Sequence, residues 1–472
     1  MGDDLKNKSI LIVFEGGFTE GGKIHQENIK NRVNASIVLY LNPIVFLKKK
    51  FKDFLKSDRL DGLNPILNLL LSVLTLTLFV IFWVAAIFLL FFLRATLSWK
   101  SYISLFKNLT LNKVLVGDGI LSSVMRSRYS RAMLEDSFRF HLILSLYVSF
   151  FFAIWLYIVL LNWVCILIGI DKYHWITDCV YINNSFRRLL SHKNSTEVRY
   201  TNDNYNFYQN FKPNRSLQLE NYYVDHEKKV SYSVESYSKA KDLVNRIIDK
   251  KADMGFLTSE AFNQLNKLNV KKGLLTVQRK SVVLFMHSYA DAQYDFGVDE
   301  FLDIHEWQNE TIDICLQCGL DIYIRPHPEM LVKSHLNFPS ELKYLDKLSH
   351  DYCIDLSDLN KNAIIETNKE RVFFISPFLN LREVQKILGM YLCATHHGSV
   401  AVESAYLGHD VIASVASPYD KNLDIFIDFY STKEKYKELV VNWGQKSTKI
   451  EDEKLTAVLS FILRNNLRYK II

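Results

Sequence analysis

The segment YLCATHHGSVAVESAYLGHDVIAS (residues 391–414) decides the fold that we expect for the C-terminal part of this chain. Its apolar beginning, Tyr391–Thr395, predicts a buried strand, and Asp410–Ser414 predicts a second one. Between them, Val400–Leu407 has the apolar spacing of a helix that starts after Gly398 and ends at a further glycine. A strand, a helix and a strand joined by short glycine turns are typical of a parallel sheet covered by helices.

The same alternation continues upstream of the quoted segment. Ser281–Met286 and Asp321–Arg325 predict two more buried strands, and Glu300–Cys318 between them predicts an amphipathic helix. Asn380–Leu388 predicts the helix that leads into the quoted segment. We therefore expect residues 281–472 to form an α/β domain.

The first 180 residues carry a weaker version of this pattern. Ser9–Glu15, Ala35–Leu41 and Lys113–Val116 predict strands. We expect residues 1–180 to form a second Rossmann-like domain that faces the first one across a cleft.

Residues 181–280 separate these two domains. They are polar and rich in Asn, Tyr and Lys, and they show helical spacing only near Ser236–Lys250. We interpret them as a linker and irregular region.

Two long apolar runs interrupt the N-terminal half. Ile66–Leu93 contains 28 residues without a formal charge, and Leu142–Ile170 also lacks formal charges. A helix that spans a bilayer needs about 20 apolar residues. Trp155 and Trp163 in the second run are residues of the kind that settle at membrane interfaces. We therefore expect both runs to be membrane-associated helices.

The composition excludes some classes of partner. A formal net charge of +6 over 472 residues is a mild excess, so we expect no nucleic acid, which needs a concentrated basic face. The excess suits a protein that rests against an anionic membrane. The six cysteines are sparse, which favours free thiols in a reducing compartment.

The first motif that could carry chemistry is Arg325-Pro326-His327-Pro328-Glu329, at the carboxyl end of a predicted strand. Ligands of open parallel sheets bind beyond the carboxyl ends of the strands. The two prolines stiffen the loop and hold His327 in one place, from which it could donate to a phosphate or a base. Arg325 could pair with a phosphate. The alternative is a rigid turn with an exposed histidine.

The second motif is Thr395-His-His-Gly-Ser-Val-Ala-Val-Glu-Ser404, which joins a strand to a helix. Gly398 allows the backbone to approach a ligand closely. The amides of Ser399 and Val400, with the helix dipole, would make an anion site. Glu403 lies one turn into the helix and could take ribose hydroxyls. The alternative is ordinary turn chemistry with a serine cap.

These two motifs carry a resemblance to a known family. Residues from about Lys280 to Ser417 resemble the nucleotide-sugar domain of GT-B glycosyltransferases, and most closely the bacterial capsule-polysaccharide transferases that use CMP-activated acidic sugars. These are the Kdo transferases and polysialyltransferases. The resemblance rests on His327-Pro328, on the Gly398-Ser399 turn with the helix after it, and on His287-x-x-x-Asp291 followed by a helix around Trp307.

The resemblance implies an inverting, metal-independent transferase with no cofactor, in which side chains and amides neutralise the leaving phosphate. His327 would be catalytic by stabilising the departing nucleotide. The expected donor-binding residues are Arg325, His327, Pro328, His397, Gly398, Ser399, Val400, Glu403 and Ser404.

The acceptor side needs a carboxylate that removes a proton from the acceptor hydroxyl. Related transferases keep an acidic residue in the N-terminal domain, and Asp118 in a tight Gly117-Asp118-Gly119 turn is our candidate for this base. Glu15, beside Gly16 and Gly17, is the competitor. An Asp-Gly turn without a catalytic role is the alternative for Asp118.

The expected function is transfer of a sugar, from a CMP-linked donor, to a surface or capsular polysaccharide or its lipid-linked precursor. The expected place is the cytoplasmic face of a bacterial inner membrane. A CDP-polyol phosphotransferase of the teichoic-acid type and a non-catalytic membrane scaffold are the alternatives.

The apolar runs create a problem of topology. If both crossed the bilayer, the segment between them, Ser98–Arg139, would face the side opposite to the C-terminal domain. We expect instead that the runs dip into one leaflet or lie in the interface.

Overall fold

The computed structural model describes residues 9–13, 35–40, 65–111, 114–126, 137–167, 172–177, 185–186, 189, 195–201, 204–209, 234–249, 280–289, 294, 299–331, 339–398, 400–417, 426–445, 455 and 458–459. The chain divides into two compact units. Unit 1 contains Met1–Val124 and Glu135–Leu217, and unit 2 contains Met125–Leu134 and Gln218–Ile472.

Unit 2 is built on a seven-stranded sheet with the order β10-β11-β9-β8-β12-β13-β14. Its strands are β8 (Ser281–Phe285), β9 (Asp321–Arg325), β10 (Ile364–Glu366), β11 (Val372–Ile375), β12 (Leu392–Thr395), β13 (Asp410–Ser414) and β14 (Asp428–Tyr430). Neighbouring strands pair in parallel, except that β10 is antiparallel to β11 at one edge. The predicted parallel sheet is therefore confirmed.

The path of the chain through this sheet reverses once. From β8 the chain adds β9 and then β11 on one side, and it returns to the other side of β8 with β12, β13 and β14. This is the strand order of a doubly wound, dinucleotide-binding sheet. The reversal falls between β8 and β12, and ligands of such sheets bind in the crevice at that point.

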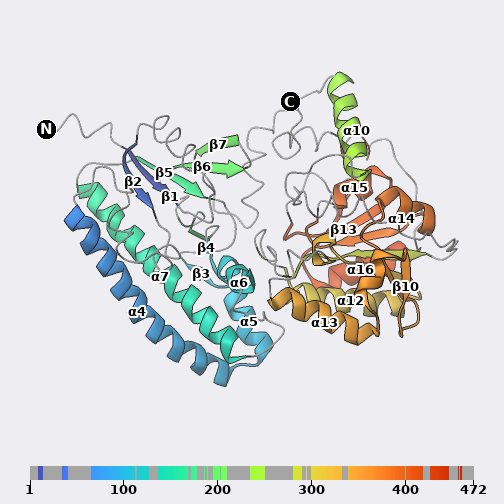
Figure 1. Ribbon diagram of the computed structural model, residues 1–472, viewed down its shortest axis with the longest axis horizontal. Helices are drawn as coiled ribbons and strands as arrows, with labels where there is room; N and C mark the ends of the chain where they lie inside the picture. The colour runs from blue at the N-terminus through green and yellow to red at the C-terminus, as the bar shows by residue number, and fades with distance from the viewer. Residues whose placement is uncertain are drawn as a thin grey trace. The chain divides into compact units, whose positions relative to one another are not determined.

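Helices cover both faces of the unit 2 sheet (Figure 1). One face carries α12 (Ile304–Gln317), α13 (Pro339–Tyr352) and α16 (Lys433–Gln445), and the other carries α10 (Val234–Ile248), α14 (Leu381–Leu388) and α15 (Val400–Tyr406). The helix ends follow from local sequence. Asn380 and Glu383 form a reciprocal capping box at the start of α14. Gly319 and Gly408, with φ of 68° and 87°, end α12 and α15, as predicted.

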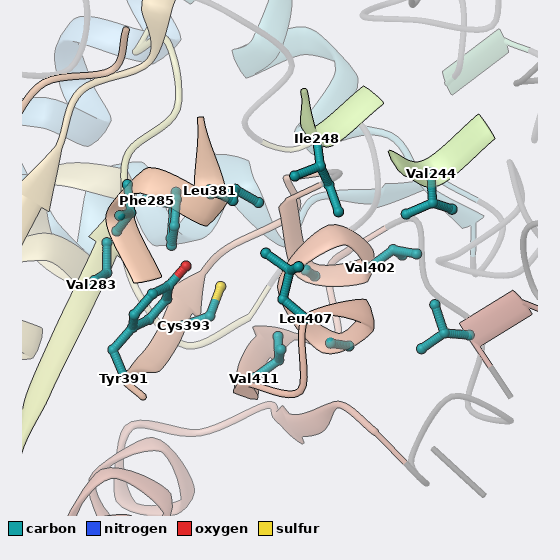
Figure 2. Close-up of a cluster of buried hydrophobic side chains, with 14 of the residues drawn as sticks. Val244, Ile248, Val283, Phe285, Leu381, Tyr391, Cys393, Val402, Leu407 and Val411 are labelled. Carbon is teal, nitrogen blue, oxygen red and sulfur yellow. The ribbon is translucent and has the colours of Figure 1, made fainter. Parts of the chain in front are cut away.

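The core of unit 2 includes a helix that the sequence suggested was part of a linker. Val244 and Ile248 of α10 are buried together with Val402 and Leu407 of the α15 segment, as Figure 2 shows. Arg382 of α14 forms an ion pair with Asp249 just after α10, with 3.4 Å between Nε and Oδ1. The C-terminal unit therefore includes α10, and it does not begin at residue 281.

Unit 1 contains a five-stranded sheet with the order β2-β1-β5-β6-β7. The strands are β1 (Ser9–Val13), β2 (Ala35–Tyr40), β5 (Lys172–Thr177), β6 (Ser195–Thr201) and β7 (Asn204–Gln209). The first four pair in parallel, and β7 is antiparallel to β6. β6 and β7 lie in the interval that we interpreted as linker, because their weak apolar pattern gave no signal of a strand. Unit 1 thus extends past residue 180.

The predicted tight turn at Gly117-Asp118-Gly119 is wrong. Short strands β3 (Thr110–Leu111) and β4 (Val114–Leu115) pair, and the three residues then form the first turn of α6 (Gly117–Arg126). An acidic residue is favourable in the first turn of a helix, where amide groups have no helical partner. A side chain at Gly117 would meet the carbonyl oxygen of Phe106 at 1.7 Å, so this glycine allows two backbone segments to touch.

The two apolar runs form the long helices α4 (Pro65–Thr96) and α7 (Phe138–Leu167), joined in part by α5 (Trp99–Lys107). Two stretches of these helices, Thr77–Thr96 and Phe138–Leu156, are long and apolar enough to cross a membrane. Helix formation is confirmed over the whole first run and over the second run as far as Leu167, the last of its residues that the structure describes.

Candidate functional site

Three histidines end three neighbouring strands of the unit 2 sheet. In the strand register, Phe285 of β8 lies beside Arg325 of β9 and beside Thr395 of β12. His287, His327 and His397 each follow one of these residues by two positions. Since the strands are parallel, all three histidines belong to the same edge of the sheet. The two motifs singled out in the sequence are therefore brought together, with β8 between them.

His287 lies at the reversal of strand order and touches the β12 loop. Its Nε2 accepts the backbone N–H of His397 at 3.3 Å and lies 3.3 Å from Oγ1 of Thr395. Its ring stacks on the ring of His397, with 3.9 Å between centroids. Burial, followed by the charges on His327 and His396, holds the pKa of His287 well below 6.5. His287 is therefore a neutral ring whose Nε2 is an acceptor and whose proton is on Nδ1.

Gly398 has a second role that the sequence did not predict. A Cβ at this position would lie 2.9 Å from Cε1 of His287 and 2.9 Å from Oγ1 of Thr395. The glycine thus makes room for the His287 ring and not only for a ligand. It keeps the stacked pair of His287 and His397 in place.

A buried carboxylate orients the two histidines that follow β12. Oδ2 of Asp299 lies 2.9 Å from Nε2 of His396, and Nδ1 of His396 lies 2.8 Å from Nδ1 of His397. Ser414, at the end of β13, donates its hydroxyl to the same Asp299 oxygen at 2.6 Å. Both side chains of the Asp299–His396 pair are almost fully buried. We name Asp299, His396 and His397 the relay.

The relay restricts where its protons can be. Asp299, as a carboxylate, accepts the Nε2 proton of His396. Only one proton can then lie between the two facing Nδ1 atoms of His396 and His397. If it is on His396, that ring is an imidazolium beside Asp299, and the neutral His397 carries its own proton on Nε2. If it is on His397 instead, both rings are neutral and Nε2 of His397 is an acceptor.

Arg325 is buried, and its guanidinium forms hydrogen bonds within the protein. Its Nη2 donates to the carbonyl oxygens of Pro377 and Leu379 at 3.1 and 2.6 Å. Burial lowers the pKa of Arg325, while the neighbouring Tyr391 hydroxyl and Glu403 carboxylate act in the opposite direction. Arg325 therefore braces the loop after β11, and Glu403, which is half-buried, contributes compensating charge.

The other residues predicted to bind the donor differ in how accessible they are. Pro328 begins the short 3-10 helix η1 (Pro328–Leu331), which holds the loop of the half-buried His327. Val400 is the first residue of α15, which has only 7 residues, so its dipole is small. Ser404 is fully buried on the inner side of α15, where a ligand would not reach it. Ser399 lies outside the described residues.

Of the predicted acceptor-side residues, the structure describes Asp118 only. Asp118 has an exposed fraction of 0%, and its Oδ1 accepts the N–H of Gly119 at 2.8 Å. This position favours the structural alternative over the catalytic one, because a general base must reach the acceptor hydroxyl. Glu15, Gly16 and Gly17 lie outside the described residues.

Sequence reasoning missed Asp299, His396 and His287 as members of the site. His396 and His287 had a usable signal, since each comes directly after a predicted strand or within two residues of it. Asp299 had none, because it lies 97 residues from His396 and precedes a helix on the other side of the sheet. Trp307, quoted for the resemblance, packs edge-on against His396, with 5.9 Å between ring centroids.

Comparisons with known proteins return distant neighbours. No family model matches this sequence, and no curated protein matches it. Among solved structures, the chain is similar to a beta-Kdo 2,4 transferase from Thermosulfurimonas dismutans, with 12% identity, a TM-score of 0.33, and coverage of 64% of this chain and 88% of that chain. It is also similar to the sucrose-phosphate synthase from Thermosynechococcus elongatus, with 12% identity, a TM-score of 0.27, and coverage of 68% of this chain and 78% of that chain.

The first neighbour is a Kdo transferase, which is the class of enzyme that the sequence motifs resemble. At these TM-scores neither similarity is evidence for the activity of this chain. The activity proposed below is therefore argued from the residues of the chain itself.

Proposed function

We propose that this chain is a glycosyltransferase that binds the nucleotide of an activated sugar donor at the carboxyl edge of the unit 2 sheet. One observation carries the proposal. The sheet has the doubly wound strand order, and His287 and His397 end the two strands between which that order reverses. His327 ends the next strand along, so the proline-braced loop belongs to the same edge.

The relay supplies chemistry that suits a leaving phosphate. When the shared proton is on His396, Nε2–H of His397 is a hydrogen-bond donor that the contact with His396 holds in one orientation. Donors that are fixed before the reaction stabilise the charge that develops on the departing nucleotide. We assign the same role to His327, and we assign Gly398 and Val400 to the loop that approaches the phosphate. Glu403 remains the candidate for the ribose.

For the acceptor side, we now favour Glu15 over Asp118 as the base. Glu15 follows β1 by two residues, and β1 lies between β2 and β5, where the strand order of the unit 1 sheet reverses. Asp118 is buried, as described above. Glu15→Gln should abolish transfer while leaving nucleotide affinity unchanged, whereas Asp118→Asn should lower the melting temperature. Full activity in Glu15→Gln with none in a folded Asp118→Asn variant would reverse this assignment.

The finer terms of the proposal rest on the motif resemblance and on the two apolar helices. They are an inverting, metal-independent reaction, a CMP-linked donor, and a surface or capsular polysaccharide or lipid-linked precursor as acceptor. The proposal also includes a location at the cytoplasmic face of a bacterial inner membrane.

Nucleotide titration of the purified full-length chain tests the donor site. We expect CMP to bind more tightly than UDP, and His327→Ala and His397→Ala each to weaken binding about tenfold or more, because a hydrogen bond to a charged group contributes about 1.5–3 kcal/mol. His350→Ala is the matched control, since the side chain of His350 is 91% exposed on α13. Separate assays with CMP-sugars and CDP-glycerol distinguish a glycosyltransferase from a polyol phosphotransferase.

Two results would count against the proposal. If no nucleotide binds at millimolar concentration, the sheet edge is not a donor site and the scaffold alternative gains support. If the control variant loses as much affinity as His327→Ala and His397→Ala, the nucleotide binds elsewhere.

A further inference from the structure

The two apolar helices of unit 1 differ in what covers them. Only 11% of the Thr77–Thr96 stretch of α4 is buried inside the protein, against 56% of the Phe138–Leu156 stretch of α7. A core helix of this length would be mostly buried. The large exposed side chains of α4 include Ile81, Val84, Phe88, Leu89 and Phe92, which we name the α4 face. Ile81, Val84, Phe88 and Phe92 are three and four residues apart and Leu89 adjoins them, so the α4 face lies on one side of the helix.

The opposite side of α4 packs on α7, and the two helices run antiparallel. Near one end, Phe91 lies against Phe138 with 5.7 Å between ring centroids. Further along, Nε1 of Trp83 donates to Oγ of Ser145 at 3.1 Å. The side that an interfacial helix normally turns to water is thus occupied by protein, while the α4 face is left uncovered.

The middle of α7 packs in turn against a segment of unit 1 that is bonded to the β4–α6 junction. The rings of Phe151 and Phe186 stack with 4.9 Å between centroids. Ser185, next to Phe186, donates its hydroxyl to the carbonyl oxygen of Val116 at 2.8 Å. Val116 joins β4 to α6 and stands two residues before the buried Asp118. Loop backbone and a carboxylate therefore lie at the level of the centre of α7.

This packing is incompatible with a hairpin that crosses a bilayer. If α4 and α7 both spanned, the β4–α6 junction would lie at the depth of the hydrocarbon core. Non-helical backbone and ionisable groups at that depth are costly and are tolerated only inside a large membrane-embedded protein body. An arrangement in which only the α4 face meets lipid avoids this cost.

We propose that α4 lies along the membrane surface, with the α4 face sunk among the acyl chains of one leaflet and α7 on the protein side. The chemistry of the face identifies lipid as the occupant. From Ile66 to Leu93 there is no charged residue. At the end of the helix, Arg94 lies over the ring of Trp99, 5.8 Å from its centroid, a pairing suited to a headgroup layer. The hairpin tip and the rest of the protein then lie on the same side of the membrane.

This inference rests on the membrane association included in the proposed function, but not on the donor site. Nucleotide binding by unit 2 measures the donor site alone. A variant that loses membrane binding and keeps nucleotide affinity, or the reverse, therefore shows which of the two has failed.

The first test is flotation of the full-length chain with vesicles of phosphatidylethanolamine and phosphatidylglycerol. Phe88 and Phe92 are 74% and 66% exposed, so glutamate is tolerated there by the fold. We expect Phe88→Glu combined with Phe92→Glu to lower vesicle binding about tenfold or more, because two charges would have to enter the acyl region. Leu342→Glu, at an exposed leucine of unit 2, is the matched control and should bind as the unchanged chain does.

The second test locates the tip of the hairpin in bacterial membranes. Ser104→Cys adds a thiol on the exposed side of α5, and the exposed Cys318 and Cys353 report the side on which unit 2 lies. We expect a membrane-impermeant reagent to label all three positions in inside-out vesicles and none in intact cells, with the sites identified by peptide mass spectrometry.

Three outcomes would overturn the inference. Labelling of position 104 from the side opposite to Cys318 and Cys353 would mean that the hairpin crosses the bilayer. Unchanged vesicle binding in the Phe88→Glu, Phe92→Glu variant would mean that the α4 face does not touch lipid. If that variant also changed from an oligomer to a monomer in size-exclusion chromatography, the face would be a contact between copies of this chain.

Discussion

His287 and His396, at the carboxyl edge of the unit 2 sheet, are held by different partners, and each partner restricts the positions of the ring protons in a different way. His287 accepts the N–H of His397, and His396 lies between Asp299 and His397. The chemistry of the candidate site therefore depends on residues that would not themselves touch the ligand.

Asp299→Asn tests the relay. An amide cannot make the charge-assisted hydrogen bond that a carboxylate makes with His396, so we expect nucleotide affinity to fall about tenfold, within the range of a lost charged hydrogen bond. We also expect the ¹⁵N shifts of His396 and His397 to show the loss of the shared proton. Ser414→Ala removes a donor to Asp299 and leaves its charge, so its effect should be smaller. Equal nucleotide affinity in Asp299→Asn and the unchanged chain would show that the relay is only structural.

Gly398→Ala tests the contact with His287. The added methyl group would overlap the His287 ring, and overpacking of this kind costs about 1–3 kcal/mol. We expect urea denaturation to show this loss in the unchanged background and a smaller loss in a His287→Ala background, where only the close contact with Thr395 remains. If both backgrounds lose the same amount, the overlap with the His287 ring contributes nothing to the loss.

At the scale of elements, α10 shows how a helix outside the predicted domain becomes part of its core. Its apolar side packs on α15 and α14, and Arg382 bonds to Asn245 as well as to Asp249. The apolar spacing in the sequence predicted the helix. It did not predict which residues the helix packs on, because they lie about 150 residues further along the chain.

Ile248→Ala measures what α10 contributes. Ile248 is 2% exposed, so truncating it should lower the free energy of unfolding of unit 2 by about 2–5 kcal/mol. Lys241→Ala, on the exposed side of the same helix, should change it by less than about 0.5 kcal/mol. Urea denaturation followed by tryptophan fluorescence gives both values. A change below that of the control would place α10 outside the folded unit.

At the scale of the whole molecule, buried neutral histidines make stability depend on pH. Burial lowers the pKa of His409 to about 4 and that of His287 well below 6.5. The unfolded chain binds these protons at higher pH than the folded protein does, so stability is complete above about pH 6.5 and falls as the pH drops below it.

We expect His409 alone to cost unit 2 about 2 kcal/mol of unfolding free energy between pH 7 and pH 5, since one pKa unit corresponds to about 1.36 kcal/mol. His409→Asn keeps an acceptor for the N–H of Tyr391 without a titrating ring. The fall in stability between these pH values should therefore be smaller in this variant by about that amount. An identical fall in both proteins would mean that His409 is protonated in the fold.

The local elements of unit 2 follow from sequence alone. β9 and β13 have the predicted limits, and α14 and α15 match within one residue at each end. Apolar spacing, caps and glycine turns act between residues close in the chain, so they can be read from it. The same reasoning placed His327 and His397 at strand ends. It was wrong at Gly117–Gly119, where the same residues suit a turn or a helix start.

Only the tertiary structure decided which strand ends meet. The position of β8 between β9 and β12, the bond from Asp299 to His396, and the burial of Asp118 and Ser404 all depend on packing between distant segments. The two apolar runs make the same point, because they are alike in sequence and yet 56% of the Phe138–Leu156 stretch is buried by protein, against 11% of the Thr77–Thr96 stretch. Apolar composition determines that a surface must be removed from water, and the neighbours that the fold brings to it determine what covers it.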